Sequence, residues 1–363
     1  MKKKILFLGR FPPPVHGASL MNESYFKGKE MNSHFELRRI KINYFDNLKE
    51  MGSVNLKKFF GIFVVFFKLL KELIIFKPDL VFFEIPIKGI AFLRDSLFAL
   101  ECKMFRKKIL FQTHTKGLKN TAYKRFIFKN SKMIILSPLL YHEISEIFDK
   151  EDVYFVANGI KDEISDKEFI KIIEQRVKNK EIQLLFLSNM YETKGPLDVL
   201  KICNYLNGKI KFKCSFAGNF PDKEIEKKWF SLRKEFGLNE KCIYLGPKYG
   251  DDKEELLKNT NFLIFPTQYE NESFPLVILE SLMFGIPVLS YDTGAIREIV
   301  SKKYLGYISK AGNWEELAKV LIKKIKEKQD YKRIRDYFKK NYNFEVAENK
   351  LIDIFEKGLK IDK

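Results

Sequence analysis

The chain has 363 residues, 45% of them hydrophobic, which suits two globular domains and argues against a largely disordered protein. Its net charge is +19, and residues 1–150 hold 28 Lys+Arg against 13 Asp+Glu, so most of the excess lies in the first half. The four cysteines form no C-x-x-C pair and the four histidines are scattered, which argues against a Cys/His zinc site and favours inert thiols in a reducing compartment.

The basic first half favours an anionic partner, which could be lipid, nucleic acid or a phosphorylated acceptor. A general richness in lysine, with solvated basic faces, is the alternative interpretation. No zinc spacing, RNP-like run or compact basic motif is present, so we predict no nucleic-acid partner. The apolar run after Lys2–Lys4 is too short for a signal peptide, and we therefore expect a cytoplasmic protein.

The first elements in chain order are typical of an α/β domain. Residues 3–9 predict a buried strand, which is followed by a proline-rich loop, Gly17 and a helix from Ser19. Three prolines stiffen the loop, and Gly17 lets backbone approach a ligand closely. Gly9 and Gly17 are too far apart for a G-x-G-x-x-G fingerprint, and a plain structural turn is the alternative.

Residues 55–76 predict a helix that combines aromatic and aliphatic side chains with lysines. Its uninterrupted apolar stretch, between Lys58 and Lys68, is well short of the roughly 20 residues that cross a bilayer. Interfacial membrane helices often have this composition, so we expect part of its surface to rest on an anionic membrane. The alternative is a helix that flanks a sheet and keeps its lysines in water.

Alternation of strands and helices continues through the first half, with strands at 35–42, 77–86, 107–114 and 131–137, and residues 153–160 close that half. Helices are predicted at 87–105 and after Pro138. His114 falls at the carboxyl end of a strand, where ligands gather in parallel sheets, although a lone histidine is more often structural. A charged segment follows residue 160, and we place the domain boundary near residue 165.

The second half restarts the alternation. Strands are predicted at 183–189, 211–218, 241–246, 261–265, 286–290 and 304–310. Helices are predicted at 195–206, before residue 260, at 275–284, after Gly294 and from residue 313 onward. Lys194 immediately precedes the helix predicted at 195–206, where a cation and free N–H groups together suit a diphosphate. A surface lysine after a turn is the alternative interpretation.

Two carboxylates stand out between residues 261 and 300. Glu272 lies in a polar loop after a strand, and Glu280 lies in the following helix, which begins with Pro275 in its first turn and ends before Gly285. This helix is apolar on nearly all sides and should be buried, so Glu280 needs a cation or hydrogen-bond donors. The pair could bind sugar hydroxyls beside the N–H groups of the helix. An exposed loop glutamate and a salt-bridged core glutamate are the alternative.

The segment resembles the signature of glycosyltransferase family 4, a family of retaining enzymes with the GT-B fold. The resemblance is carried by Glu272-x7-Glu280 and, in order, Gly285-Ile286-Pro287-Val288, Thr293-Gly294 and Glu298-Ile299-Val300. Residues 156–160 also resemble the V-x-N-G-V stretch that precedes the interdomain linker of the family. The implied architecture is α/β: two Rossmann-like domains facing across a cleft, with a last helix, 344–360, that crosses back to the first domain.

The resemblance also implies roles for single residues. Glu272 and His114 would lie near the donor sugar, Lys194 would bind the diphosphate, and Glu280 would bind the ribose hydroxyls. The backbone near Ser273, Phe274, Pro275 and Leu276, together with Gly17, would border the donor phosphates, and Gly246 would border the base. The family usually carries an arginine where this chain has Asn189, which weakens one expected diphosphate contact.

The implied function is transfer of a sugar from a nucleotide-sugar donor to a hydroxyl of a glycan or lipid-linked acceptor, as in bacterial lipopolysaccharide or capsule synthesis. Residues 1–165 with 344–363 would bind the acceptor, and 166–343 the donor. The chain contains no Asp-x-Asp, so we predict no metal and no cofactor. An inactive GT-B-like subunit of a glycan assembly complex, favoured by Asn189, and an epimerase or sugar phosphate synthase on the same fold remain alternatives.

Overall fold

The computed structural model describes residues 1–42 and 56–360, with side chains for all of these except 56–60 and 360. It divides into two compact units, Met1–Gly159 with Phe344–Lys363 and Ile160–Asn343. The division falls a few residues before the boundary expected near residue 165. Its physical basis is Asp162 and Ile164, which accept hydrogen bonds from the buried Arg335 and so belong to the second unit.

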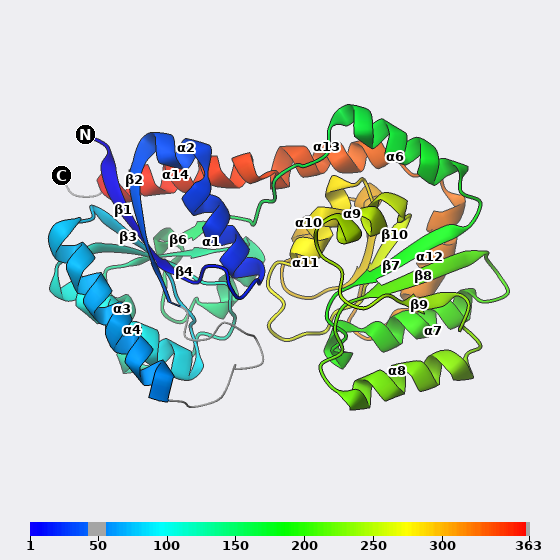
Figure 1. Cartoon of the computed structure of the whole chain (residues 1–363), viewed down its shortest axis with the longest axis horizontal. Helices are drawn as coiled ribbons and strands as arrows, with labels where there is room; N and C mark the ends of the chain where they lie inside the picture. The colour runs from blue at the N-terminus through cyan, green and yellow to red at the C-terminus, as the bar shows by residue number, and fades with distance from the viewer. Residues whose placement is uncertain (43–55, 361–363) are drawn as a thin grey trace. The chain divides into compact units, whose positions relative to one another are not determined.

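Unit 1 contains a six-stranded parallel sheet in the order β2-β1-β3-β4-β5-β6 (Figure 1). The strands are β1 (Lys3–Gly9), β2 (Phe35–Lys41), β3 (Leu80–Glu84), β4 (Lys108–Gln112), β5 (Lys132–Ile135) and β6 (Val153–Phe155). The helices are α1 (Gly17–Lys27), α2 (Lys29–His34), α3 (Leu56–Ile75), α4 (Gly89–Met104), α5 (Ala122–Phe128) and α14 (Phe344–Lys360).

Some elements of unit 1 differ from the sequence-based expectations. Helix α1 begins at Gly17, two residues early, because His16 and Ser19 form a reciprocal capping box. The segment after Ser137 is a 3₁₀ helix, Pro138–Glu143, with Ser137 capping it. Strand β4 ends at Gln112, so His114 lies just beyond the strand. Residue 55 of the predicted helix, and the side chains of Lys57 and Lys58, lie outside the described part.

Unit 2 repeats the architecture with a sheet in the order β12-β11-β10-β7-β8-β9. The strands are β7 (Ile182–Leu187), β8 (Phe212–Ala217), β9 (Cys242–Tyr244), β10 (Phe262–Phe265), β11 (Val288–Tyr291) and β12 (Gly306–Ser309). The helices are α6 (Asp166–Lys178), α7 (Pro196–Leu206), α8 (Lys223–Glu235), α9 (Gly250–Asn259), α10 (Leu276–Met283), α11 (Ile296–Ile299), α12 (Trp314–Lys326) and α13 (Tyr331–Tyr342).

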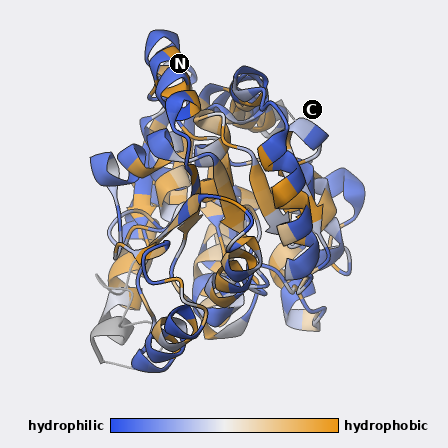
Figure 2. Cartoon of the chain, turned by 90° about the vertical axis from the view of Figure 1, so that its right-hand side faces the viewer, coloured by the Kyte–Doolittle hydropathy of each residue, from blue (hydrophilic) through white to orange (hydrophobic). Residues whose placement is uncertain are grey.

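Both sheets are buried on two faces, as all-parallel sheets generally are. Every residue of β3 and of β10 is buried. The strand ribbons that can be seen in Figure 2 are coloured mainly as hydrophobic. The expectation that the last helix returns to the first domain is confirmed: α14 packs on α2 and β3, and Phe355 contacts Phe7, Phe35 and Phe82. The predicted α/β fold with two Rossmann-like domains is confirmed as well.

Candidate active site

In unit 2 the strand order reverses direction between β7 and β10. Strands β8 and β9 extend the sheet on one side of β7, and β10, β11 and β12 extend it on the other. Loops that leave β7 and β10 therefore run beside each other at the carboxyl edge, which is the usual ligand position in such sheets. A hydrogen bond joins them, since the Gln268 N–H donates to the Thr193 carbonyl at 2.7 Å.

Lys194 and Glu272 meet at this edge. Lys194 ends the short 3₁₀ turn Glu192–Lys194 after β7, and its Nζ lies 2.5 Å from Glu272 Oε2. The Glu272 carboxylate also accepts from Thr267 Oγ1 at 3.3 Å, and Lys194 Nζ lies 4.4 Å from the Tyr269 ring centroid. Both side chains of the ion pair are mostly buried. The structure thus brings together two of the residues that the sequence singled out.

Two glycines permit this close approach. Gly195, in the left-handed region with φ 86°, packs so closely on Pro266 that an added Cβ would lie 2.3 Å from its carbonyl oxygen. Gly294 has φ 58°, and its Cβ would lie 2.3 Å from the Glu272 carbonyl. A side chain at either position would both strain the backbone and displace a loop of the site. This requirement explains the Lys194-Gly195 and Thr293-Gly294 pairs in physical terms.

Helix α10 places Glu280 on its one partly exposed face, with Leu276 and Val277. The prediction of a helix buried on nearly all sides was therefore wrong for this face, although Ile278, Leu279 and Leu282 are buried. The cation that Glu280 was expected to need is Lys253 of α9, whose Nζ lies 2.7 Å from Glu280 Oε1. The Glu280 side chain is 20% exposed, so its carboxylate, which is held by one lysine, can still be reached by a ligand's hydroxyl groups.

The segment from Ser273 to Leu276 leads into α10. Pro275 is the residue before the helix rather than part of its first turn, and no side chain caps the helix N-terminus. The Phe274 ring is buried and lies 5.9 Å from the Tyr342 ring, so its side chain serves the core. Backbone N–H groups and the half-buried Leu276 could supply the expected donor contacts here.

Asn189 and Gly246 lie on neighbouring loops of the same edge. Asn189 follows β7 and is exposed, two residues past the strand end. Gly246 follows β9 with φ 70°, and its carbonyl accepts from the Gly218 N–H at 3.0 Å. The two residues thus stand on the β7 side of the switch point, with the strand β8 between their parent strands.

Unit 1 has its own switch point, between β1 and β3, and a charged cluster occupies it. Arg10 follows β1, and its guanidinium donates to Glu84 Oε1 at 2.7 Å and to Asp95 Oδ2 at 3.1 Å. Glu84 ends β3 and is buried; burial would raise its pKa, but Arg10 and, to a smaller extent, His114 outweigh burial and hold the pKa below its usual value. Glu84 is therefore ionised at neutral pH.

His114 and Gly17 belong to this edge of unit 1 and not to the cluster of unit 2. Burial lowers the pKa of His114 to about 4, against the opposing charge of Glu84, so the imidazole is neutral at neutral pH. A neutral imidazole can both donate and accept a hydrogen bond, which suits contact with a sugar hydroxyl. Gly17 is the exposed first residue of α1, directly after the capping His16.

Several site residues were not found from the sequence. Lys253 and Thr267 contact the predicted acids, and the Tyr269 ring contacts Lys194. Arg10 and Glu84 form the core of the unit 1 cluster. A signal existed for Glu84, which is a carboxylate at the end of an otherwise apolar strand, and for Thr267 after β10. Lys253 carried none, because its partner lies 27 positions away in the chain.

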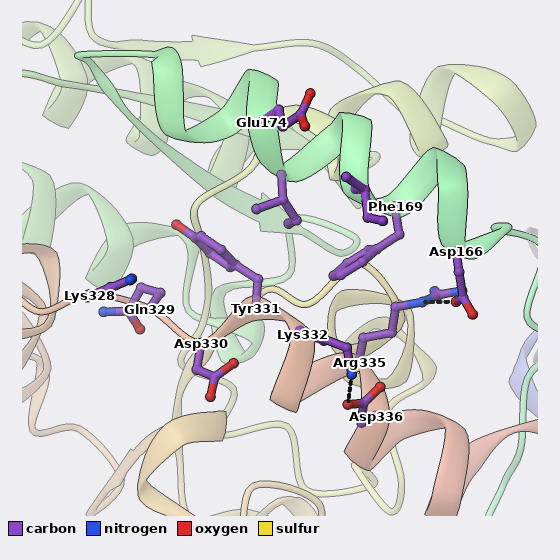
Figure 3. Close-up of a pocket in the computed structure, with 12 residues that line it drawn as sticks. Asp166, Phe169, Glu174, Lys328, Gln329, Asp330, Tyr331, Lys332, Arg335 and Asp336 are labelled. Carbon is purple, nitrogen blue, oxygen red and sulfur yellow. Dashed lines mark hydrogen bonds and ion pairs between the residues drawn. The ribbon is translucent and has the colours of Figure 1, made fainter.

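A cavity of about 770 Å³ lies elsewhere in unit 2, between α6 and residues 328–336. Figure 3 shows Phe169 and Tyr331 beside it, with the Arg335–Asp166 pair at one end. None of the predicted site residues lines it. Among the residues that the structure describes, no group of three or more His, Cys, Asp or Glu side chains could hold a metal ion. That the protein needs no metal stays a prediction.

The two units together have the same fold as several solved glycosyltransferases. A glycosyltransferase from Rickettsia africae aligns with a TM-score of 0.79 at 17% identity, over 99% of this chain and 100% of that one. HepE from Anabaena in complex with UDP gives 0.72 at 15%, over 98% and 100%. The lipopolysaccharide outer core galactosyltransferase WaaB gives 0.66 at 16%, over 98% and 99%. The fold is GT-B.

The family follows from the sequence of unit 2. The model of the family described as "Glycosyl transferases group 1" matches residues 167–341, which lie within unit 2. N-acetyl-alpha-D-glucosaminyl L-malate synthase from Bacillus anthracis is 22% identical over 236 residues, which are 64% of this chain and 60% of that protein. The alignment thus leaves about two fifths of that relative uncovered. These matches confirm the predicted resemblance to the family.

Proposed function

We propose that the protein transfers a glycosyl unit from a nucleotide-sugar donor to a hydroxyl of a glycan or lipid-linked acceptor, with retention of anomeric configuration. The observation that carries this proposal is the Lys194–Glu272 pair at the switch point of unit 2, with Glu280 on the helix that follows. Lys194, Glu272 and Glu280, for which the resemblance implies phosphate, sugar and ribose contacts, lie on the loops and the helix at one edge of this sheet.

Glycosyl transfer breaks the bond between the anomeric carbon and a phosphate oxygen, so negative charge builds up on the leaving diphosphate. Lys194 and the uncapped N-terminus of α10 supply positive charge and N–H donors for it. Glu272 orients the donor sugar, and Glu280 binds the ribose hydroxyls, releasing Lys253. Neutral His114 would contact a sugar hydroxyl from unit 1.

We further propose that the donor is bound mainly by unit 2 and the acceptor by unit 1, and that the protein works in bacterial envelope polysaccharide synthesis at the cytoplasmic face of the membrane. HepE, which binds UDP, and WaaB, a lipopolysaccharide galactosyltransferase, share the fold and support the substrate classes. The basic composition of residues 1–150 supports an anionic or lipid-linked acceptor.

A thermal-shift screen with UDP-, GDP-, ADP- and CMP-sugars tests the proposal. A donor at one hundred times its Kd adds about 2.7 kcal/mol to the free energy of unfolding. We expect one nucleotide series to stabilise the protein, and Glu280→Ala to remove the effect. Glu168→Ala is the matched control, because Glu168 also pairs with a lysine at 3.0 Å but lies on α6, outside the cluster.

Release of the nucleoside diphosphate with a lipid-linked acceptor, and the anomeric configuration of the product by NMR, then test transfer and retention. The alternative function is an inactive GT-B-like binding subunit, which the exposed Asn189, in place of the family's arginine, favours. Absence of stabilisation by every donor would support that alternative, whereas donor binding with product formed in the absence of acceptor would indicate an epimerase.

A further inference from the structure

Helix α3 is hydrophobic on both of its sides. Its inner side chains Val65, Leu69 and Leu73 are buried in the core of unit 1, as is Phe76 directly after the helix. At helical spacing on the outer side stand Phe63, Phe66, Phe67 and Ile74, and Phe67 remains 62% exposed. A helix that flanks a sheet normally presents polar residues to solvent, so this outer stripe has no role within the described fold.

The neighbouring helices continue the same exposed surface. Helix α4 contacts α3 and lies beside it over the sheet (Figure 1), and α5 contacts α4. The outer side of α4 is apolar from end to end, with Ile90 at 81% exposure and Leu93 at 56%. We call the following set the apolar face: Phe63, Phe66, Phe67 and Ile74 of α3, Ile90, Leu93, Leu97 and Met104 of α4, and Tyr123 and Phe126 of α5.

The charge around the apolar face has one sign. Residues 61–130 hold 14 Lys+Arg against 5 Asp+Glu, a balance of +9. All five acids are engaged or buried: Asp79 pairs with Lys3, Glu72 with Arg38, Glu84 and Asp95 with Arg10, and Glu101 is buried. The exposed cations among them are Lys68, Lys71, Lys77, Arg106, Lys119, Arg125 and Lys129.

We infer that the apolar face docks on a bilayer surface that contains anionic lipid. Exposed aromatic and aliphatic side chains flanked by cations match a membrane interface, where apolar groups enter the acyl boundary and lysines meet headgroups. Two copies of this basic face would repel each other, which disfavours self-association through it. None of the described helices is both long and apolar enough to cross a bilayer, so contact would be from one side.

This inference rests on the proposed location at the membrane and names the face that makes the contact, but it does not require the protein to be catalytically active. Unlike the sequence-based expectation, which concerned only residues 55–76, it assigns α4 and α5 to the contact. Loss of one interfacial aromatic or leucine side chain should weaken partitioning about tenfold or more, and neutralising one lysine about fivefold. The lysine effect should diminish at high salt, and the apolar effect should persist.

Vesicle flotation tests the inference with the full chain and with two kinds of vesicle, phosphatidylcholine alone and phosphatidylcholine mixed with anionic phosphatidylglycerol. We expect binding to the anionic vesicles at low salt. Phe67→Ser with Leu93→Gln should reduce binding at least a hundredfold, by the estimate above, and Lys68→Gln with Lys71→Gln about 25-fold. Ile170→Gln with Val177→Gln on α6 is the matched control, because these residues are also 58% and 67% exposed but lie in unit 2.

Each outcome is decisive. Wild-type protein that stays with the soluble fraction at low salt overturns the inference, as does equal loss of binding in the α6 control. A concentration-dependent dimer in sedimentation velocity that Phe67→Ser with Leu93→Gln abolishes would instead assign the face to a second copy. Donor-induced thermal stabilisation, measured on the same variants, reports unit 2 separately: its persistence shows that a failure of membrane binding leaves the proposed transferase function intact.

Discussion

Replacing Lys194 by methionine should destabilise unit 2 and abolish transfer, and the two effects can be separated. The ammonium lies 2.5 Å from Glu272 Oε2, and the side chains are only 15% and 10% exposed. Removing one member of a buried pair typically costs 3–5 kcal/mol because the other charge stays buried. Thr267 Oγ1 still donates to Glu272, so we expect a loss of about 3 kcal/mol, at the lower end of that range.

The assay is calorimetry of the wild type, Lys194→Met, Glu272→Gln and the double variant. A loss of about 3 kcal/mol corresponds to a Tm decrease of roughly 6–12 °C for a domain of this size. The double variant buries no charge and should recover about 2 kcal/mol relative to Lys194→Met. Transfer should fall at least roughly a hundredfold in all three variants, since stability does not restore the lost charge on the leaving group.

Lys201→Met is the control for the cycle. Lys201 pairs with Asp198 at 2.9 Å but is 40% exposed, so its removal should cost under about 1 kcal/mol. If Lys194→Met costs no more than this control, or if the double variant is as unstable as Lys194→Met, the pair is not a buried electrostatic unit and the reasoning fails.

Two further predictions concern backbone and pH. Gly195→Ala should lower the free energy of unfolding by at least about 2 kcal/mol more than Gly208→Ala, and it should remove donor-induced stabilisation. Both glycines have positive φ, but only an alanine at position 195 would collide with backbone, at Pro266. Equal Tm losses in the two variants would contradict this. Burial raises the pKa of Glu101 to about 7 from 4.5, so the native state favours its protonated form, and stability present below pH 4.5 is lost as pH rises through 7. Glu101→Gln should therefore leave the free energy of unfolding nearly unchanged at pH 4.5 and raise it by roughly 2–3 kcal/mol at pH 8, as measured by urea unfolding. A difference between variant and wild type that does not change with pH would refute the raised pKa of Glu101.

Much of the fold could be predicted from the sequence, because strand and helix periodicities and the glycines and prolines that end elements are local properties. The alternation of strands and helices, the restart of the pattern after residue 165 and the strand–helix–strand unit around Glu272 and Glu280 are of this kind. Errors fell where local signals compete: the capping box moved the start of α1 to Gly17, and the helix α8 carried too few apolar residues to stand out.

What only the tertiary structure decided is which side chains meet. Strand order places the loops after β7 and β10 together, and so joins Lys194 to Glu272 across 78 positions of the chain. The same ordering joins Arg10 to Glu84 across 74 positions. Composition showed that the first half is basic, yet only helix packing showed that α3, α4 and α5 leave apolar side chains outside. Periodicity determines which residues share a face of an element, but the partner of that face depends on contacts between distant segments, which no local pattern records.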